Sequence, residues 1–190
     1  MVQTIASPII ARIARAHAQV LQLTGDLPER ALRWRAGPRA PAIRFHLWHL
    51  ARWADKVQAS LPTLTPELGG RLAAAEEIWA VQALAIRWGL TPGQLGDSDT
   101  GMGLDDEASA ALPLPDRDEL LAYARRAFAT TERSLATIEA ADLVAPCTDL
   151  YGNPNVVGDV LLSHLGHVNR HLGMVEALRG VQGMSGTATW

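Results

Sequence analysis

The sequence predicts an all-α protein, namely a four-helix bundle with an extra short helix and a long loop between the second and third main helices. Two observations favour this fold class. In four separate stretches apolar residues recur at steps of three and four, which places them on one face of a helix. No convincing strand pairs and no internal repeat are found. We expect a single domain over residues 1–190, with flexible or peripheral tails at 1–7 and 181–190.

The first two main helices are predicted over residues 8–24 and 41–61. Pro41 suits the first turn of the second helix, because the N–H that proline lacks has no partner there anyway. The predicted faces are formed by Ile10, Ile13, Ala14, His17, Val20 and Leu21 in the first helix, and by Ile43, Leu47, Leu50, Ala54, Val57 and Leu61 in the second.

A weaker helical pattern, EEIWAVQALAIRWGL, follows at residues 76–90 and ends at Gly89 and Pro92, which predicts the extra short helix. The next stretch, TPGQLGDSDTGMGLDDEASAALPLP, is too rich in Gly, Pro and Asp for a packed element. It is also longer than an ordinary connection. We therefore expect this loop to wrap the surface or to cover a site as a lid.

The remaining two main helices follow this loop. Asp116 is a suitable N-cap, with Glu119 three residues on, for a helix that carries apolar residues as far as Ile138. The last helix is predicted from about Val156 to Arg179, with Gly180 as its stop.

Composition and charge exclude several function classes. The formal net charge is −3 and no basic stripe is present, so nucleic acid is not an expected partner. No stretch approaches the roughly 18 to 20 uninterrupted apolar residues of a membrane span. Cys147 is the single cysteine, and arginines interrupt the apolar N-terminal stretch, unlike a signal peptide. We expect a soluble, cytoplasmic protein that acts on a small molecule.

Three histidines of the last helix, His164, His167 and His171, lie on its apolar face or at the edge of that face. His164 and His171 are two turns apart, about 10 Å along the axis, and cannot readily share one ion. His167 can pair with either. Spacing of four residues is the commoner chelating geometry on a helix, which favours His167 with His171. The zinc-protease motif is absent, because V-N-R-H contains no glutamate.

The segment RFHLWHLARWADK adds His46 and His49. His46 lies closer to the apolar face, so periodicity alone does not select His49 as a third ligand and leaves both open. Isolated interior histidines are most often packing residues, which is our interpretation of His17; His164 is more often structural or a partner of a ligand. Five histidines on the inner faces of two helices favour a metal site, because each unpaired buried imidazole costs free energy.

The segments WHLARWAD and GHVNRHLGMVEALRG, with the order of elements, resemble the DinB-like superfamily, and the resemblance spans most of the chain. That superfamily consists of four-helix bundles and includes thiol-dependent S-transferases that use bacillithiol or mycothiol. The resemblance implies that His49, His167 and His171 bind one divalent ion. It also implies an up-down-down-up arrangement of the helices and a homodimer. The chain differs from many members after His171, where Leu172-Gly173-Met174 replaces a polar residue such as Gln.

Three neutral imidazoles around Zn²⁺, Ni²⁺ or Fe²⁺ leave a coordination position open, as in catalytic sites. We therefore expect a metal-dependent enzyme, either a transferase that uses a low-molecular-weight thiol or a hydrolase. The alternative is a metal-binding or stress-response interaction bundle without catalysis.

Four further side chains flank the expected ligands. Trp53 can wall the pocket or belong to the core, and Asp55 is expected in a salt bridge or interhelix contact. Arg52 and Arg170 are candidates for binding anionic substrate groups, although an ordinary solvated face explains them equally well.

Overall fold

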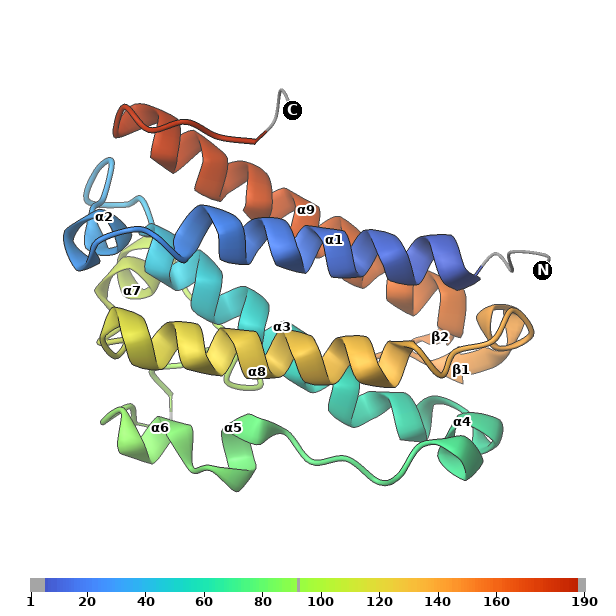
Figure 1. Cartoon of the computed structure of the whole chain (residues 1–190). Coiled ribbons are helices and arrows are strands. Elements are labelled where there is room, and N and C mark those ends of the chain that lie inside the picture. Colours follow the sequence, from blue (N-terminus) through green and yellow to red (C-terminus); the bar gives the residue numbers. More distant parts are fainter. Residues whose placement is uncertain (1–5, 92, 188–190) are drawn as a thin grey trace.

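The computed structural model describes residues 6–91 and 93–187, and this part of the chain is mostly helical (Figure 1). The all-α fold class is thereby confirmed. The long helices are α1 (Ala6–Thr24), α3 (Ile43–Leu64), α8 (Arg117–Leu135) and α9 (Val157–Val181). The short elements are α2 (Glu29–Arg33), α4 (Pro66–Arg71), α5 (Ile78–Val81), α6 (Leu84–Arg87), α7 (Asp106–Ala111), the 3₁₀ helix η1 (Asp142–Val144), β1 (Pro146–Thr148) and β2 (Pro154–Val156).

The long helices lie lengthwise beside one another. Helices α1 and α9 run in one direction, and α3 and α8 run in the opposite direction (Figure 1). Helix α3 packs against both α8 and α9, and α1 also contacts both of them. The core between them is apolar; its largest fully buried members include Trp48, Tyr123, Phe128, Ile13, Leu47 and Leu61.

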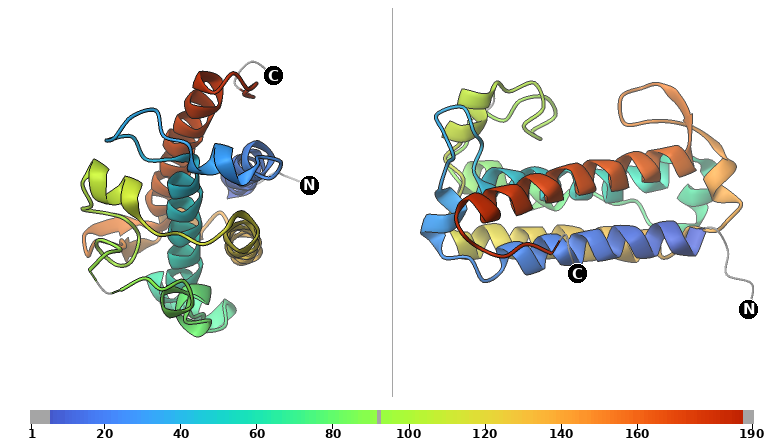
Figure 2. Two further views of the ribbon diagram at one scale, coloured as in Figure 1. Left: turned by 90° about the vertical axis from the view of Figure 1, so that its left-hand side faces the viewer. Right: turned by 90° about the horizontal axis from the view of Figure 1, so that it is seen from above.

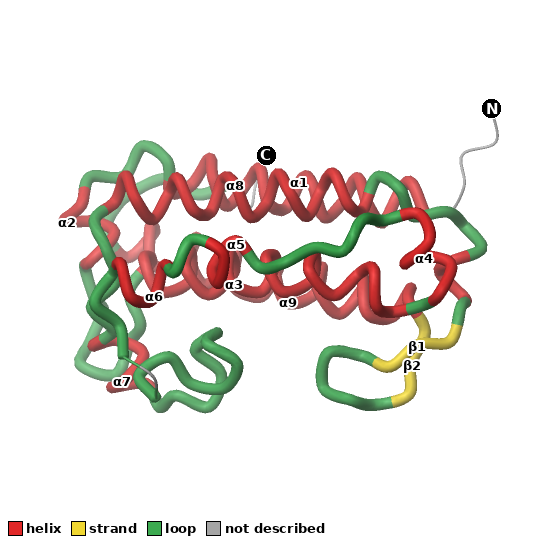
Figure 3. The backbone as a smooth tube through the Cα atoms, turned by 90° about the horizontal axis from the view of Figure 1, so that it is seen from below, coloured by secondary structure: helices red, strands yellow, loops and turns green. Residues whose placement is uncertain are grey.

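Two segments extend from the same side of the molecule, as the views from above and below both show (Figures 2 and 3). One is the loop that leads into α7, and the other is the hairpin formed by β1 and β2. The strands pair in antiparallel register, with Pro146 opposite Val156. Both segments lie next to the histidines of α3 and α9, so their positions matter for the site.

Several sequence predictions need correction. Residues 76–90 form two short helices, α5 and α6, because Ala83 between them adopts a left-handed backbone (φ 48°) that ends a helix. The predicted loop contains α7, whose N-cap Asp105 accepts a hydrogen bond from the Ala108 N–H (2.7 Å). The strands β1 and β2 were not expected, since three residues each are too few to show an alternating pattern.

The ends of the last two long helices test the predicted boundaries. Asp116 caps α8 as predicted, because its carboxylate accepts the Glu119 N–H (3.0 Å). Helix α9 does not stop at Gly180 but continues to Val181, and the left-handed glycine that follows it is Gly183 (φ 77°).

The tails predicted at residues 1–7 and 181–190 lie partly outside the described part of the chain, which excludes residues 1–5 and 188–190. Of the predicted N-terminal tail, Ala6 already belongs to α1. At the C-terminal end, the Thr187 N–H donates to the Glu176 carboxylate (2.7 Å), so the chain turns back along α9. None of the helices in the described part of the chain is long and apolar enough to cross a membrane.

Candidate metal centre

Helices α3 and α9 bring His49, His167 and His171 together, with one possible ligand atom from each lying within 4.8 Å of the others. His167 and His171 are one turn apart on α9, so both project from the same face. The Nε2 atoms of His49 and His167 are 2.9 Å apart across the contact between the two helices. The structure therefore groups the three histidines that the resemblance implied as ligands.

The orientation of His49 is set by the loop before α7. Its Nδ1–H donates to the Thr100 carbonyl, which fixes the tautomer and leaves the lone pair on Nε2. The next residue, Gly101, has φ 89°, and a Cβ there would lie 3.0 Å from the Trp48 ring. Glycine thus allows this backbone to approach α3 closely. The contact makes Thr100 part of the site, which the side-chain pattern of the sequence did not indicate.

His46 and His49 have different places in the site. Both are only 5% exposed, which explains why periodicity could not separate them. His46 is not a member of the group of three, but its Nδ1 is 2.9 Å from Nδ1 of His171. When Nδ1–H of His171 donates to Nδ1 of His46, Nε2 of His171 keeps the lone pair that a metal ligand needs. His46 is thus placed to orient His171, a role that the sequence analysis did not foresee.

All four histidines are neutral at physiological pH. Burial, together with the neighbouring His49, lowers the pKa of His46 to about 4. Burial, the neighbouring His49 and the positive charge of Arg170 together lower the pKa of His167 to about 3. The pKa values of His49 and His171 are also lowered, mainly by burial. Neutral imidazoles carry the lone pairs that divalent ions require, so little proton release opposes metal binding at neutral pH.

His17 and His164 form a separate pair. Their Nε2 atoms are 3.3 Å apart, and the His17 Nδ1 lies 3.1 Å from a carboxylate oxygen of Glu132. The His17 ring also stacks on Phe128, with 4.2 Å between ring centroids. Both side chains are buried and hydrogen-bonded, which agrees with the packing role expected for His17 and the structural role favoured for His164.

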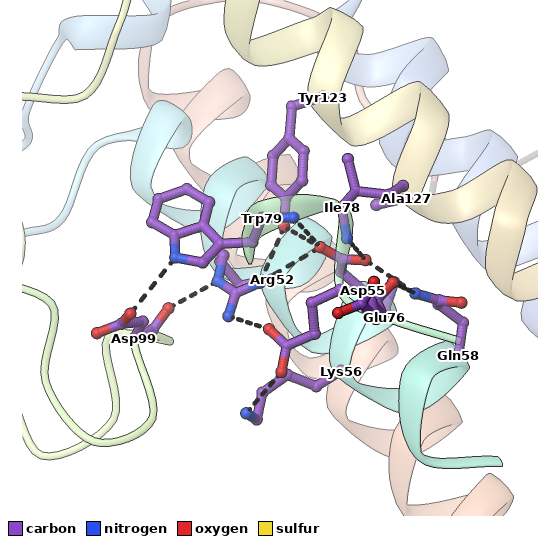
Figure 4. A network of polar contacts seen from close by, with 12 residues as sticks. Arg52, Asp55, Lys56, Gln58, Glu76, Ile78, Trp79, Asp99, Tyr123 and Ala127 are labelled. Carbon is purple, nitrogen blue, oxygen red and sulfur yellow. Dashed lines mark hydrogen bonds and ion pairs between the residues drawn. The ribbon is translucent and has the colours of Figure 1, made fainter. Parts of the chain in front are cut away.

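Arg52 belongs to a buried polar network, and is neither an anion-binding surface residue nor part of a solvated face, which corrects both interpretations of this residue (Figure 4). Its side chain is 1% exposed and donates to the Asp99 carbonyl (2.8 Å) and the Glu77 carboxylate (2.6 Å). It also donates to the Tyr123 hydroxyl (3.1 Å). Arg52 therefore ties the loop at Asp99 to α3, one turn after His49.

Asp55 has the structural role that the sequence analysis expected. Its carboxylate accepts the backbone N–H groups of Ile78 and Trp79, both at 2.9 Å (Figure 4). It also accepts the Tyr123 hydroxyl (3.0 Å) and lies 3.4 Å from the Arg52 guanidinium. These contacts attach the N-terminal end of α5 and helix α8 to α3 and take up the acceptor capacity of Asp55, so no proton-transfer role is indicated.

Two cavities flank the three histidines. The first, of about 540 Å³, is bounded by His167, Trp53, Arg170 and the β1–β2 hairpin. The second, of about 520 Å³, is lined by His49, His171 and His46. Met102, in the loop before α7, lines both. The loop thus covers the site, in agreement with its predicted position, and Trp53 is both a buried aromatic and a cavity wall.

Comparisons with solved structures and with family models agree with this fold. A search of curated proteins found no match. The crystal structure of a conserved protein from Enterococcus faecalis superposes with a TM-score of 0.73 at 18% sequence identity, covering 95% of this chain and 99% of that one. This similarity concerns the fold alone. The family model of the DinB superfamily matches residues 12–175, which include all five histidines of α3 and α9. The chain therefore belongs to the DinB superfamily.

Proposed function

We propose that His49, His167 and His171 bind one divalent ion, Zn²⁺, Ni²⁺ or Fe²⁺, and that the protein is a metal-dependent enzyme. The observation that carries this proposal is the convergence of three imidazoles from two helices between two cavities. Within the part of the chain that the structure describes, no carboxylate or thiol joins this group. Three protein ligands with adjacent free space are typical of catalytic sites, whereas structural sites use four.

The donor set suits such an ion. Imidazole nitrogen is a good ligand for Zn²⁺, Ni²⁺ and Fe²⁺. The Thr100 carbonyl orients His49, and His46 lies beside His171, as partners of metal ligands do in metalloproteins. When bound, an ion held by three neutral ligands supplies Lewis acidity, which polarises a substrate or makes a thiol or water more acidic.

The surrounding residues define what the chain itself does for the reaction. Trp53 and Met102 form apolar walls that limit the access of water to the His167 side of the site. Arg170 places a positive charge at the same cavity. A thiol-dependent transferase and a hydrolase both fit this arrangement, and we favour the transferase because the DinB superfamily includes thiol-dependent S-transferases.

The test combines metal analysis with a reaction. Tag-free protein is loaded with each candidate ion and incubated with an electrophile, monobromobimane, and with bacillithiol, mycothiol or cysteine in turn. Metal-dependent conjugation that His167→Ala abolishes supports the transferase. Hydrolysis of ester substrates without a thiol supports the hydrolase. A bound ion with no turnover in either assay contradicts the enzyme and favours the alternative of a non-catalytic metal-binding or stress-response bundle.

Three further properties are proposed on the same basis. We propose that the long helices form the up-down-down-up bundle of the superfamily, which their directions in Figure 1 support. We also propose that the protein is a cytoplasmic homodimer. Sedimentation velocity measures the oligomeric state directly, and a monomer at micromolar concentration would contradict the dimer.

A further inference from the structure

The cavity beside His167 combines a cationic side chain with aromatic walls. We propose that it binds an organic anion with a flat apolar body, such as an aromatic carboxylate, with the anionic end at Arg170 and the body against Trp53 and Tyr151. The inference rests on the proposed function, since a ligand in this cavity lies next to a proposed metal ligand. It identifies a substrate class that the metal centre by itself does not define.

The anionic end is assigned from Arg170. This side chain is exposed and lines the cavity three residues after His167 on α9. No carboxylate of the described residues lies within ion-pair distance of it, whereas Arg52 is engaged by Asp55 and Glu77. Its charge contributes to lowering the pKa of both His167 and His171, which agrees with its position beside them. A planar guanidinium with free donors fits a carboxylate through two parallel hydrogen bonds.

The flat body is assigned from the aromatic wall. Tyr151 lies in the turn between β1 and β2 and is 64% exposed, which is unusual for a large aromatic residue. Its ring centroid is 5.8 Å from that of Trp53, with the rings tilted by 45°. The turn is well held, because the Asp149 carboxylate accepts the N–H groups of Tyr151 and Asn153, both at 2.9 Å. An exposed aromatic ring held at a cavity edge provides a stacking surface.

Asp149 is the acidic group of this cavity. The backbone N–H of Asn153 is the main cause that lowers its pKa, so the carboxylate is charged at neutral pH. Its charge is partly compensated by the N–H groups that it accepts in the turn. Asp149 belongs to the hairpin, whereas Arg170 belongs to α9 and has no such compensation. A ligand carboxylate is therefore favoured at the Arg170 end of the cavity.

The second cavity provides a contrast within the same molecule. Its wall includes Phe45, Leu104 and Leu178, and none of the described lysines or arginines lines it. Among the described residues the one charged side chain of this wall is Asp106, which lies 3.9 Å from the Arg39 guanidinium, so no net positive charge attracts an anion there. Of the two cavities beside the histidines, the one with Arg170 is thus the one that suits an anion.

The experiment compares two probes of the same shape, 2-naphthoate and the neutral 2-naphthamide, in NMR titrations of the ¹⁵N-labelled full chain. We expect naphthoate to bind more tightly than naphthamide. Arg170→Gln should lower the affinity for naphthoate by roughly tenfold and the affinity for naphthamide by less than about twofold, because hydrogen bonds between charged groups are stronger than those to a neutral amide. Tyr151→Ala should weaken both probes by roughly threefold through lost stacking. The matched control is Arg126→Gln, an exposed arginine of α8 that lines neither cavity, and it should change nothing.

Metal content is measured on the same samples, before and after chelation, so that the two proposals can fail separately. Equal affinity for the two probes, or naphthoate binding that Arg170→Gln leaves unchanged, would overturn the anion site even if the ion is bound. Naphthoate binding that depends on Arg170 in a protein that binds no metal would support the anion site and contradict the proposed function.

Discussion

Removing the carboxylate of Asp55 should destabilise the protein strongly. Asp55 is 0% exposed and accepts hydrogen bonds from two backbone N–H groups and the Tyr123 hydroxyl. In Asp55→Ala these donors lose their acceptor in the interior, and Arg52 loses one of its two carboxylate partners. Breaking a buried ion pair costs about 3–5 kcal/mol. Arg52 retains Glu77 at 2.6 Å, so we expect the lower part of that range, about 3 kcal/mol.

The assay is urea unfolding followed by circular dichroism. With a slope of about 2 kcal/mol per molar urea, a loss of about 3 kcal/mol lowers the midpoint by about 1.5 M. The matched control is Asp118→Ala, whose carboxylate is 86% exposed on α8 and should cost less than about 1 kcal/mol. If Asp55→Ala is no more destabilising than Asp118→Ala, the network of Figure 4 does not contribute to stability as inferred.

Two other predictions concern the histidines. His49→Ala should abolish metal binding. His46→Ala should weaken metal affinity by roughly tenfold and leave the site filled at saturating metal, because His46 contacts His171 without joining the group of three. Loss of all metal binding in His46→Ala would contradict this assignment. The metal-free protein should lose stability as the pH falls from about 6.5 towards 4, because burial lowers the folded-state pKa of His46 to about 4 and the unfolded chain is therefore protonated first. Urea unfolding midpoints measured between pH 7.5 and 4.5 report this loss of stability, which should be smaller in His46→Gln than in the unmodified protein. An equal loss in the two proteins would show that His46 is not the source of the pH dependence.

The long helices could be predicted because each carries a regular apolar face and, for α8, a clear N-cap at Asp116. Short elements depend on tertiary contacts that the sequence does not display. The break between α5 and α6 arises at Ala83, a residue with high helix propensity, while Asp55 of α3 accepts the N–H groups that begin α5. When a contact with a distant residue overrides the local helix preference in this way, the spacing of apolar residues in the sequence does not reveal it.

For the site, residue spacing selected His167 and His171, and the family resemblance selected His49. Periodicity alone could not choose between His46 and His49, because α3 is buried on nearly all sides. The contribution of Thr100 comes from its backbone carbonyl, which is the same chemical group in every residue. The close approach depends on Gly101, which the sequence analysis did not distinguish from the other glycines of this loop.

The proposed function requires that His49, His167 and His171 together hold one divalent ion. The most direct measurement is the metal-to-protein ratio, by inductively coupled plasma mass spectrometry, of tag-free protein beside His167→Ala and the control Asn169→Ala, an exposed neighbour on α9. We predict about one ion per chain in the first and third proteins and less than about a tenth of an ion in His167→Ala. Equal ratios in all three proteins would contradict the proposed ligand set.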